Sequence, residues 1–428
     1  MSTAPIEPPS AALKLDTIGN KSASKSPLTW IPSLYFAQGL PYFVVMAISV
    51  VMYKNLGVSN DDITYWTSLI GSAWVFKPAW SPLLEAFKSK KKIVVIFQLV
   101  SAAGLALAAF AVQTPNFFFL TIALLAVIAI ASATHDIACD GLYIATLSTE
   151  NQAKYAGWLG AFFNGAELFS LGGMLWLAGY FEQKIGVKPA WSIVFGILGG
   201  LMFLLALYHS RALPDTRAAQ TVGEGASIAE KIPVLDVLVS FFQKPGIWFA
   251  ICFIVLFRLG EGQINAVGQL FLKDPQSLGG LGLDTTQVAT VYGLAGTISF
   301  VCGSILGGYF AAWLGLKRAM FFLILAMNLP NAVFYFLAVS QTTNFQLIIV
   351  GLSIESFGYG FGFVGLTLFM MQVVSVGKYQ TAHYALATGI MQLGMLLPRA
   401  ISGKIQLALG YQPFFLCVLL AAVPVLIL

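Results

Sequence analysis

Twelve long apolar stretches follow one another along the chain, and each is long enough for a membrane-spanning helix. A span takes about 20 apolar residues, because a helix rises about 1.5 Å per residue and the hydrocarbon core is roughly 30 Å thick. Several stretches are longer than this, which predicts tilted or bent helices. The stretches cover approximately residues 30–53, 63–87, 93–112, 117–147, 153–181, 191–209, 246–272, 286–313, 319–340, 345–374, 381–402 and 411–428.

The low charge content supports a membrane protein. Charged residues make up only 10% of the chain, whereas ordinary soluble domains carry about 25%. The chain is therefore predicted to be an all-α polytopic membrane protein that works as a monomer in the lipid bilayer. Its four cysteines have no paired spacing and are interpreted as small buried apolar side chains. No cofactor and no metal are expected, and because the basic residues lie in loops, no nucleic acid is expected either.

The positions of Lys and Arg predict the orientation. Of the 23 such residues, fifteen lie on the side that holds residues 1–28 and the loops after even-numbered stretches, five lie on the other side, and three lie within stretches. Positive charge is retained on the cytoplasmic side, so both termini are predicted to be cytoplasmic. Residues 1–28 are rich in Ser, Pro and Lys without an apolar core, which predicts a disordered tail rather than a signal peptide.

The longest polar interruption, residues 211–244, divides the stretches six and six. We expect an N-terminal bundle over residues 29–210, a cytoplasmic linker over 211–244 and a C-terminal bundle over 245–428. Residues 227–239 of the linker are expected to form a short amphipathic helix on the membrane surface. Two six-helix, pseudo-symmetric halves joined in this way resemble the major facilitator superfamily. The loops after stretches two and eight also resemble weak copies of a loop motif of that superfamily.

Charged residues inside the stretches are the strongest functional signal. Asp136 and Asp140 end the fourth stretch and, four residues apart, share one helix face. Intramembrane charges are costly and normally face a water-filled cavity or a partner. A buried structural ion pair, or a pair that simply reaches cytoplasmic water, is the alternative. Further charges lie at similar depth in both halves, at Lys77, Glu167, Arg258, Glu261 and Glu355.

These charges predict a polar central cavity and proton coupling. The two cations can neutralise only two of the carboxylates, and an unpaired buried carboxylate favours its protonated form. Asp136 and Glu355 are the best candidates for the proton carrier, with static buried pairs as the alternative. The substrate cavity is expected to use Lys77, Glu167, Arg258 and Glu261, with Arg258 able to bind an anionic group. Polar and aromatic side chains for sugars or amides are expected from Gln38, Asn164, Gln263 and Tyr359, although Tyr more often anchors a helix at the interface.

Five short segments carry a resemblance to a known family. They resemble, in order, motifs of AmpG-type muropeptide permeases within the AmpG and acetyl-CoA transporter group. The third segment departs from the family pattern, because His135 replaces Gln and the pair Gly141-Leu142 that follows it replaces Ala-Tyr/Trp. The segments are Gly39-Leu-Pro41, Lys77-Pro-Ala-Trp80-Ser-Pro82, His135-Asp136-Ile-Ala-Cys-Asp140, Phe257-Arg258-Leu-Gly260-Glu261, and Glu355 with the glycines that follow it.

The resemblance implies a proton symporter of the bacterial inner membrane. Its cargo would be sugar-peptides from cell-wall recycling, namely N-acetylglucosaminyl-anhydro-N-acetylmuramyl peptides, and Asp136 and Asp140 would be its paired acids. Another oligosaccharide, an acyl-CoA or an uncoupled facilitator are the alternatives. A membrane-embedded enzyme built on His135, Cys139 and the two Asp residues is a further alternative, but the chain contains no Gly-x-Ser-x-Gly, His-Glu-x-x-His or P-loop motif. The chain is therefore not expected to be an enzyme.

Overall fold

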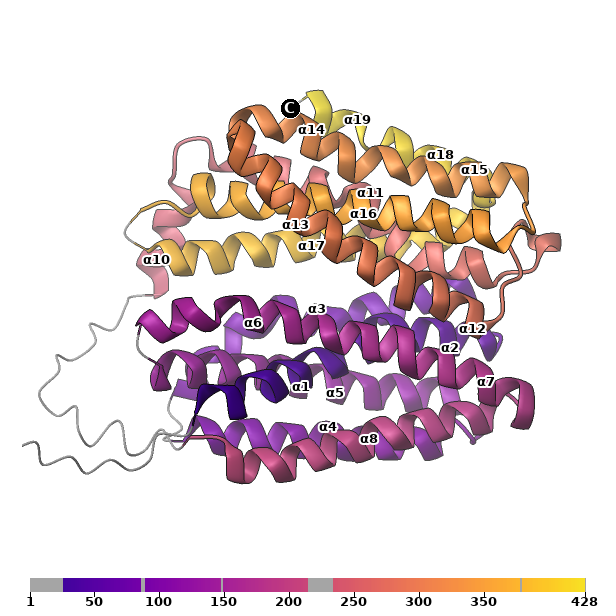
Figure 1. The fold of residues 1–428 in the computed structure, drawn as a ribbon, viewed down its shortest axis with the longest axis horizontal. Coiled ribbons are helices and arrows are strands. Elements are labelled where there is room, and N and C mark those ends of the chain that lie inside the picture. Colours follow the sequence, from indigo (N-terminus) through magenta and orange to yellow (C-terminus); the bar gives the residue numbers. More distant parts are fainter. Residues whose placement is uncertain (1–25, 86–88, 148, 215–233, 378, 428) are drawn as a thin grey trace, which may run out of the picture.

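The computed structural model describes residues 26–85, 89–147, 149–214, 234–377 and 379–427. Within these ranges every regular element is a helix. Most of the expected tail (residues 1–25) and most of the expected linker (residues 215–233) lie outside the described residues. The remainder forms two groups of helices that lie side by side, α1 to α8 and α10 to α19 (Figure 1).

The first group contains six membrane-length units in its described residues. Two of these units are interrupted by π-helical segments, labelled η2 and η3. The elements are η1 (Pro27–Thr29), α1 (Ile31–Phe43), η2 (Val44–Ile48), α2 (Ser49–Asn55), α3 (Asn60–Glu85), α4 (Lys90–Ala111), α5 (Phe117–Thr146), α6 (Thr149–Glu167), η3 (Leu168–Met174), α7 (Leu175–Ile185) and α8 (Val187–Ala212).

The second group repeats this plan after the short helix α10, again with six units in the described ranges. The elements are α10 (Val234–Phe242), α11 (Ile247–Lys273), η4 (Gln276–Leu278), α12 (Thr285–Val288), η5 (Ala289–Gly296), α13 (Thr297–Leu314), α14 (Leu316–Asn328), η6 (Leu329–Asn331), α15 (Ala332–Ser340), α16 (Phe345–Phe369), η7 (Met370–Val374), α17 (Gln380–Leu409), α18 (Tyr411–Leu420) and α19 (Val423–Ile427). Across the described residues, eight helical segments are both long and apolar enough to cross a membrane. The all-helical fold predicted from the apolar stretches is therefore confirmed.

Several of the long units that were expected to be tilted or bent contain π-helical segments. A π segment shifts the backbone hydrogen-bond register and often marks a functional site. In the first unit, Pro41 lacks an N–H and lies in the last turn of α1, three residues before η2 begins at Val44. The carbonyl of Met46 within η2 accepts a hydrogen bond from Arg399 of α17 at 2.9 Å. The break in the first half is thus tied to a side chain of the second half.

Glycines allow close packing where the two halves cross and within the second half. At Gly293 of η5, a Cβ atom would lie 2.1 Å from the carbonyl carbon of Leu171 in η3, so no other residue fits without a backbone shift. A Cβ at Gly360 of α16 would lie equally close, at 2.1 Å, to the carbonyl oxygen of Phe300 in α13. These contacts follow the general use of small residues at transmembrane helix interfaces.

Large apolar side chains remain exposed on the outer surfaces of both groups. Phe110, Tyr309 and Trp313 are 75%, 72% and 80% exposed. Such side chains are expected to contact lipid, which replaces water as the solvent of these faces.

Helix α10 carries the described part of the expected linker helix. Its described part covers Val234–Phe242, and residues 227–233 of the predicted helix lie outside the described residues. Val237 and Phe241 are buried, while Leu235 is 70% exposed. His383, in the first turn of α17, contacts the Ser240 hydroxyl at 3.1 Å. Helix α10 is therefore amphipathic and packs against α17; its position on a membrane surface stays a prediction.

Candidate substrate cavity

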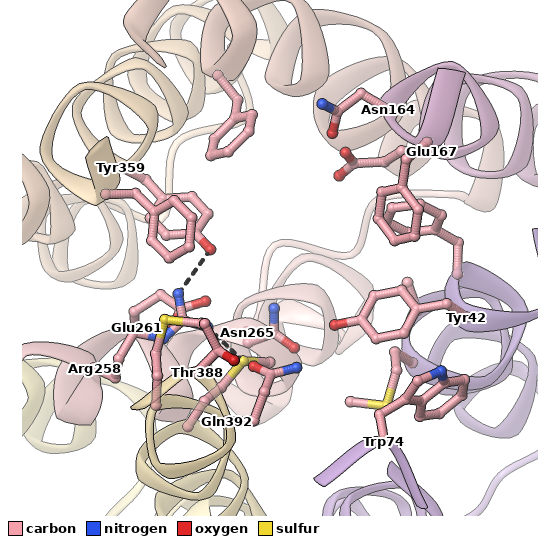
Figure 2. Close-up of a pocket in the computed structure, with 18 of the residues that line it drawn as sticks. Tyr42, Trp74, Asn164, Glu167, Arg258, Glu261, Asn265, Tyr359, Thr388 and Gln392 are labelled. Atoms are coloured by element: carbon pink, nitrogen blue, oxygen red, sulfur yellow. Dashed lines mark hydrogen bonds and ion pairs between the residues drawn. The ribbon is translucent and has the colours of Figure 1, made fainter. Parts of the chain in front are cut away.

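A cavity of about 760 Å³ lies between the two groups of helices. Charged, amide and aromatic side chains from both groups line it, and Figure 2 labels ten of the lining residues around one open space. Most of the residues predicted for the site are among them. The predicted residues that line the cavity are Gln38, Lys77, Asp136, Asp140, Asn164, Glu167, Arg258, Glu261, Glu355 and Tyr359.

On the first wall, two carboxylates of α5 have different partners. Asp136 is 6% exposed and its Oδ2 lies 3.6 Å from the Lys77 Nζ of α3. Its other oxygen, Oδ1, is buried without a hydrogen-bond partner. One turn later, Asp140 accepts a hydrogen bond from the Tyr35 hydroxyl at 3.2 Å. The i, i+4 spacing therefore places both acids on the cavity face of α5. Lys77 is the cation of this wall, and it pairs with Asp136.

On the second wall, Arg258 of α11 is the centre of a buried polar group. Its Nε lies 3.1 Å from Oε2 of Glu261, three residues later on the same helix. Its Nη1 donates to the Tyr359 hydroxyl of α16 at 3.1 Å, and its Nη2 donates to the Met395 sulfur at 2.7 Å. A thioether is a weak acceptor, so one side of this guanidinium lacks a strong acceptor. The ring of Phe363 lies 5.1 Å from its Cζ.

Two further cavity carboxylates have no cation beside them. Glu355 of α16 is 8% exposed and accepts a hydrogen bond from the Ser356 hydroxyl at 3.2 Å. Glu167, the last residue of α6, has no ion pair and no hydrogen bond to any described side chain. Asn164 lies beside Glu167, and both face the open space across from Arg258 (Figure 2). The cavity thus holds more acids than the described cations can neutralise.

Gln263 does not line the cavity. It is buried, and its Nε2 donates to the Leu259 carbonyl of its own helix at 3.1 Å. A helix turns by about 100° per residue, so Gln263 points roughly away from the face that carries Glu261 and Asn265. The periodicity of α11 contains this information: Arg258, Glu261 and Asn265 fall on one face, and Gln263 does not.

Several lining residues were not selected from the sequence as a site. They are uncharged, and in the sequence they resemble ordinary packing residues of transmembrane helices. Thr388 is one of them and lies on the cavity face of α17. The others include Phe163, Tyr292, Phe300, Phe363 and Met395.

The two groups of helices are joined by polar contacts at the end of the molecule away from the linker. Asp274, after α11, forms an ion pair with Lys54 of α2, with 2.5 Å between Oδ1 and Nζ. Asn60 of α3 donates to Oδ2 of Asp274 at 3.2 Å and to Gln406 of α17 at 2.7 Å. Tyr411 donates to the same Asp274 oxygen at 2.5 Å.

A second set of contacts lies beside these. Asn55 of α2 donates to Thr285 of α12 at 2.8 Å, and the Thr285 hydroxyl donates to Glu182 of α7. The cavity lies inward of this closed end and extends toward the linker, where Tyr384 and Thr388 line it.

Comparison with known proteins identifies the family. A model of the Major Facilitator Superfamily matches residues 33–403. The chain belongs to this superfamily. Major facilitators are transporters, so the chain is a multi-pass secondary transporter of a small-molecule substrate and not an enzyme.

Relatives of this major facilitator carry the names that the sequence resemblance implies. The anhydromuropeptide permease of Escherichia coli K12 is 26% identical over 406 residues, which cover 92% of this chain and 77% of the permease. The transporter AmpG 4 of Rickettsia conorii is 23% identical over 416 residues and 92% and 93% of the two chains. The resemblance to AmpG-type permeases is therefore confirmed at the level of a distant relationship.

Solved structures of other major facilitators share the fold. The nucleoside transporter NupG superimposes with a TM-score of 0.71 at 18% identity, covering 94% of this chain and 97% of NupG. A D-xylose–proton symporter gives a TM-score of 0.65 at 10% identity, with 93% and 96% of the chains covered. The predicted twelve-helix fold with two pseudo-symmetric halves is thus the fold of this transporter family.

Of the residues considered for an enzyme site, Asp136 and Asp140 line the cavity of this transporter, whereas His135 and Cys139 do not. His135 is 2% exposed, and one ring nitrogen lies 2.9 Å from Gln98 Nε2. The Cys139 sulfur is buried 3.4 Å from the same ring. Among the described residues, no group of three His, Cys, Asp or Glu side chains is placed to hold a metal ion. In the structure His135 and Cys139 belong to the packed interior of the first bundle.

Proposed function

We propose that this chain is a proton-coupled importer of amino-sugar glycans in the bacterial inner membrane, with anhydro-muropeptides as its first candidate cargo. The two bundles, over residues 29–210 and 245–428, would alternate access to the cavity between them, with the linker 211–244 and both termini in the cytoplasm. The names of the distant relatives support the cargo class. The volume of about 760 Å³ falls within the range of ligand cavities, roughly 300–1,000 Å³.

The observation that carries the coupling is the excess of acids in the cavity. Two cations, Lys77 and Arg258, face five carboxylates, and the ion pairs use only Asp136 and Glu261. The other three, Asp140, Glu167 and Glu355, have no cation within ion-pair distance among the described residues. An uncompensated carboxylate is costly to bury. A carrier that closes over these acids would therefore take up protons first, and Asp136, Asp140 and Glu355 are proposed as the coupling acids.

The polar and aromatic lining supports a cargo of sugars and amides. Gln38 and Asn164 on one wall and Asn265 and Gln392 on the other offer amide donors and acceptors. Tyr42, Trp74, Tyr359 and Tyr384 offer aromatic faces, on which the apolar faces of sugar rings stack. Such a lining recognises neutral, hydroxylated and acetylated groups.

Uptake into proteoliposomes tests this proposal. The purified transporter is given a labelled anhydro-muropeptide with an imposed gradient, acidic outside. We expect accumulation against the concentration gradient, and its loss on addition of a protonophore. Uptake that ignores the protonophore would refute coupling and identify a facilitator. If the muropeptide is not taken up but an oligosaccharide or an acyl-CoA is, that compound would replace the muropeptide as the proposed substrate.

A further inference from the structure

Glu167 differs from the other carboxylates of the cavity because the described protein gives it no partner. Asp136 pairs with Lys77, and Glu261 pairs with Arg258. Asp140 and Glu355 each accept a hydrogen bond from a hydroxyl. Glu167 lines the cavity, faces its open space in Figure 2 and has no such contact. Its carboxyl group is therefore available to a group that enters from outside.

Acceptors without donors lie on both walls of the same space. The Oε1 atom of Gln38 is buried without a hydrogen-bond partner, and so is the Oε1 atom of Gln269, whose residue is only 6% exposed. Both residues line the cavity. A buried acceptor without a donor is rare in a native structure and calls for an explanation. Both atoms are covered in this structure, so a ligand that brings hydrogen-bond donors would reach them once the Gln38 and Gln269 side chains rotate toward the cavity.

Gln38 and Glu167 lie on neighbouring helices at one place on the wall. A Cβ atom added at Gly39 of α1 would lie 2.9 Å from the Ala166 Cβ of α6, so the two helices touch there. Gln38 and Glu167 are the next residues on either side of this contact, and both face the cavity. Asn164, three residues before Glu167, lies beside it in Figure 2. The wall thus offers one carboxyl group without a protein partner and nearby amide oxygens.

We propose that Glu167 binds a positively charged amino group of the cargo, with Gln38 as a second acceptor. A primary ammonium has three donors and no acceptor, which matches a carboxylate beside an unused amide oxygen. The cargo class is thereby narrowed to sugar-peptides with a free side-chain amine in the peptide. This assignment rests on the proposed function for the identity of the cargo, but the amine site itself does not depend on it.

A pair of ligands that differ only at the amine tests the site. Binding to the full chain in lipid nanodiscs is measured for an anhydro-muropeptide with a free side-chain amine and for the same compound with that amine acetylated. Wild-type protein is expected to prefer the free amine by about 10- to 100-fold, the range for a hydrogen bond to a charged group. Glu167→Gln is expected to bind the two compounds alike.

Glu355→Gln is the matched control, since it removes a cavity carboxylate from the opposite half. It is expected to keep the preference for the free amine, which separates a local contact from the general charge of the cavity. The unfolding temperature of each variant shows that it is folded. A preference that survives Glu167→Gln, or an equal loss of affinity for both compounds, would overturn the proposal.

A second ligand pair separates the amine site from the cargo. If wild-type protein binds neither muropeptide, the proposed function fails, and the same comparison is made with a lysine-containing tripeptide and its Nε-acetyl form. Amine-dependent binding that Glu167→Gln removes supports the site without the muropeptide. Absence of any amine dependence in both pairs overturns it.

Discussion

The clearest perturbation is the loss of one negative charge where the two halves meet. Asp274 is held by Lys54 and Asn60 of the first half, at 2.5 Å and 3.2 Å, and by Tyr411 of its own half. Asp274→Asn keeps the shape of this side chain and removes its charge. We expect the variant to spend more time with this end of the molecule open.

The contacts set the size of the effect. The bond from Tyr411 stays within one half and persists when the halves separate, so only the contacts with Lys54 and Asn60 count. The side chain of Asp274 is 4% exposed and that of Lys54 is 17% exposed, so the pair is shielded from water. Hydrogen bonds to charged groups contribute about 1.5–3 kcal/mol each, and Asn retains part of them. The expected shift is roughly 2–3 kcal/mol, or about 30- to 150-fold in the ratio of the two states.

Distances between spin labels measure this shift. Labels are attached to cysteines placed at Gln183 of α7 and Leu278 of η4, two exposed positions on opposite halves at this end. The four native cysteines are replaced first. Asp274→Asn is expected to add a population with longer distances.

Asp284→Asn is the matched control. It removes the same charge in the same region, where Asp284 caps α12 through the Gln287 backbone N–H. Asn caps a helix about as well as Asp, so this variant is expected to behave as wild type. Identical distance distributions for wild type and Asp274→Asn would refute the idea that Asp274 holds this end closed.

Three further predictions follow from single residues. Asp136→Asn is expected to abolish accumulation driven by a pH gradient but to retain exchange of labelled cargo, which moves no net proton; loss of both would assign the residue to cargo binding. Arg399→Met removes a fully buried cation with no carboxylate in ion-pair distance among the described residues. The variant should therefore be more stable by about 1–4 kcal/mol, which a higher unfolding temperature would show, while its transport activity falls. A lower unfolding temperature would show that the hydrogen bond from Arg399 to η2 outweighs the cost of desolvating the cation. Gly293→Ala should raise the free energy of the state in which η5 packs against η3 by about 1–3 kcal/mol or more, and it should reduce uptake. Gly173→Ala adds a Cβ that meets nothing within 4 Å, so it should leave uptake unchanged.

The fold was predictable because long apolar segments of the sequence determine its helices. Each unit must satisfy its own backbone in lipid, so a stretch of apolar residues specifies a helix whatever its neighbours are. The breaks within the units were not predictable in the same way. The segments η2 and η3 have apolar sequences like the helices around them, and η2 accepts a hydrogen bond from Arg399, more than 300 residues away in the chain.

The candidate site was predictable in its charges and less so in its neutral residues. Asp136, Arg258 and Glu355 stand out in the sequence because intramembrane charges are rare and costly, and the structure places all three around one cavity. Their roles in coupling stay predictions. Gln263 was selected because it is a polar residue within a membrane span, but its position on α11 points its side chain away from the cavity. The closure around Asp274 gave no signal, since polar residues are ordinary in loops between membrane helices.

Charge in the cavity and closure at its ends are linked by desolvation. In the present state the cavity extends toward the linker, so Asp140, Glu167 and Glu355 lie in a space that cargo and water can enter. Closing the linker end would bury these three acids together, at a cost of several kcal/mol for each charge left without a partner. Protons or a cationic group of the cargo remove that cost, so we expect the loaded carrier to change state far more readily than the empty, ionised one. The contacts around Asp274 contribute the opposing free energy, because they join the two halves at the end away from the linker and must break whenever that end opens. A transporter of this kind would be coupled by the balance of these two terms, and weakening Asp274 should therefore relax coupling as well as shift the resting state.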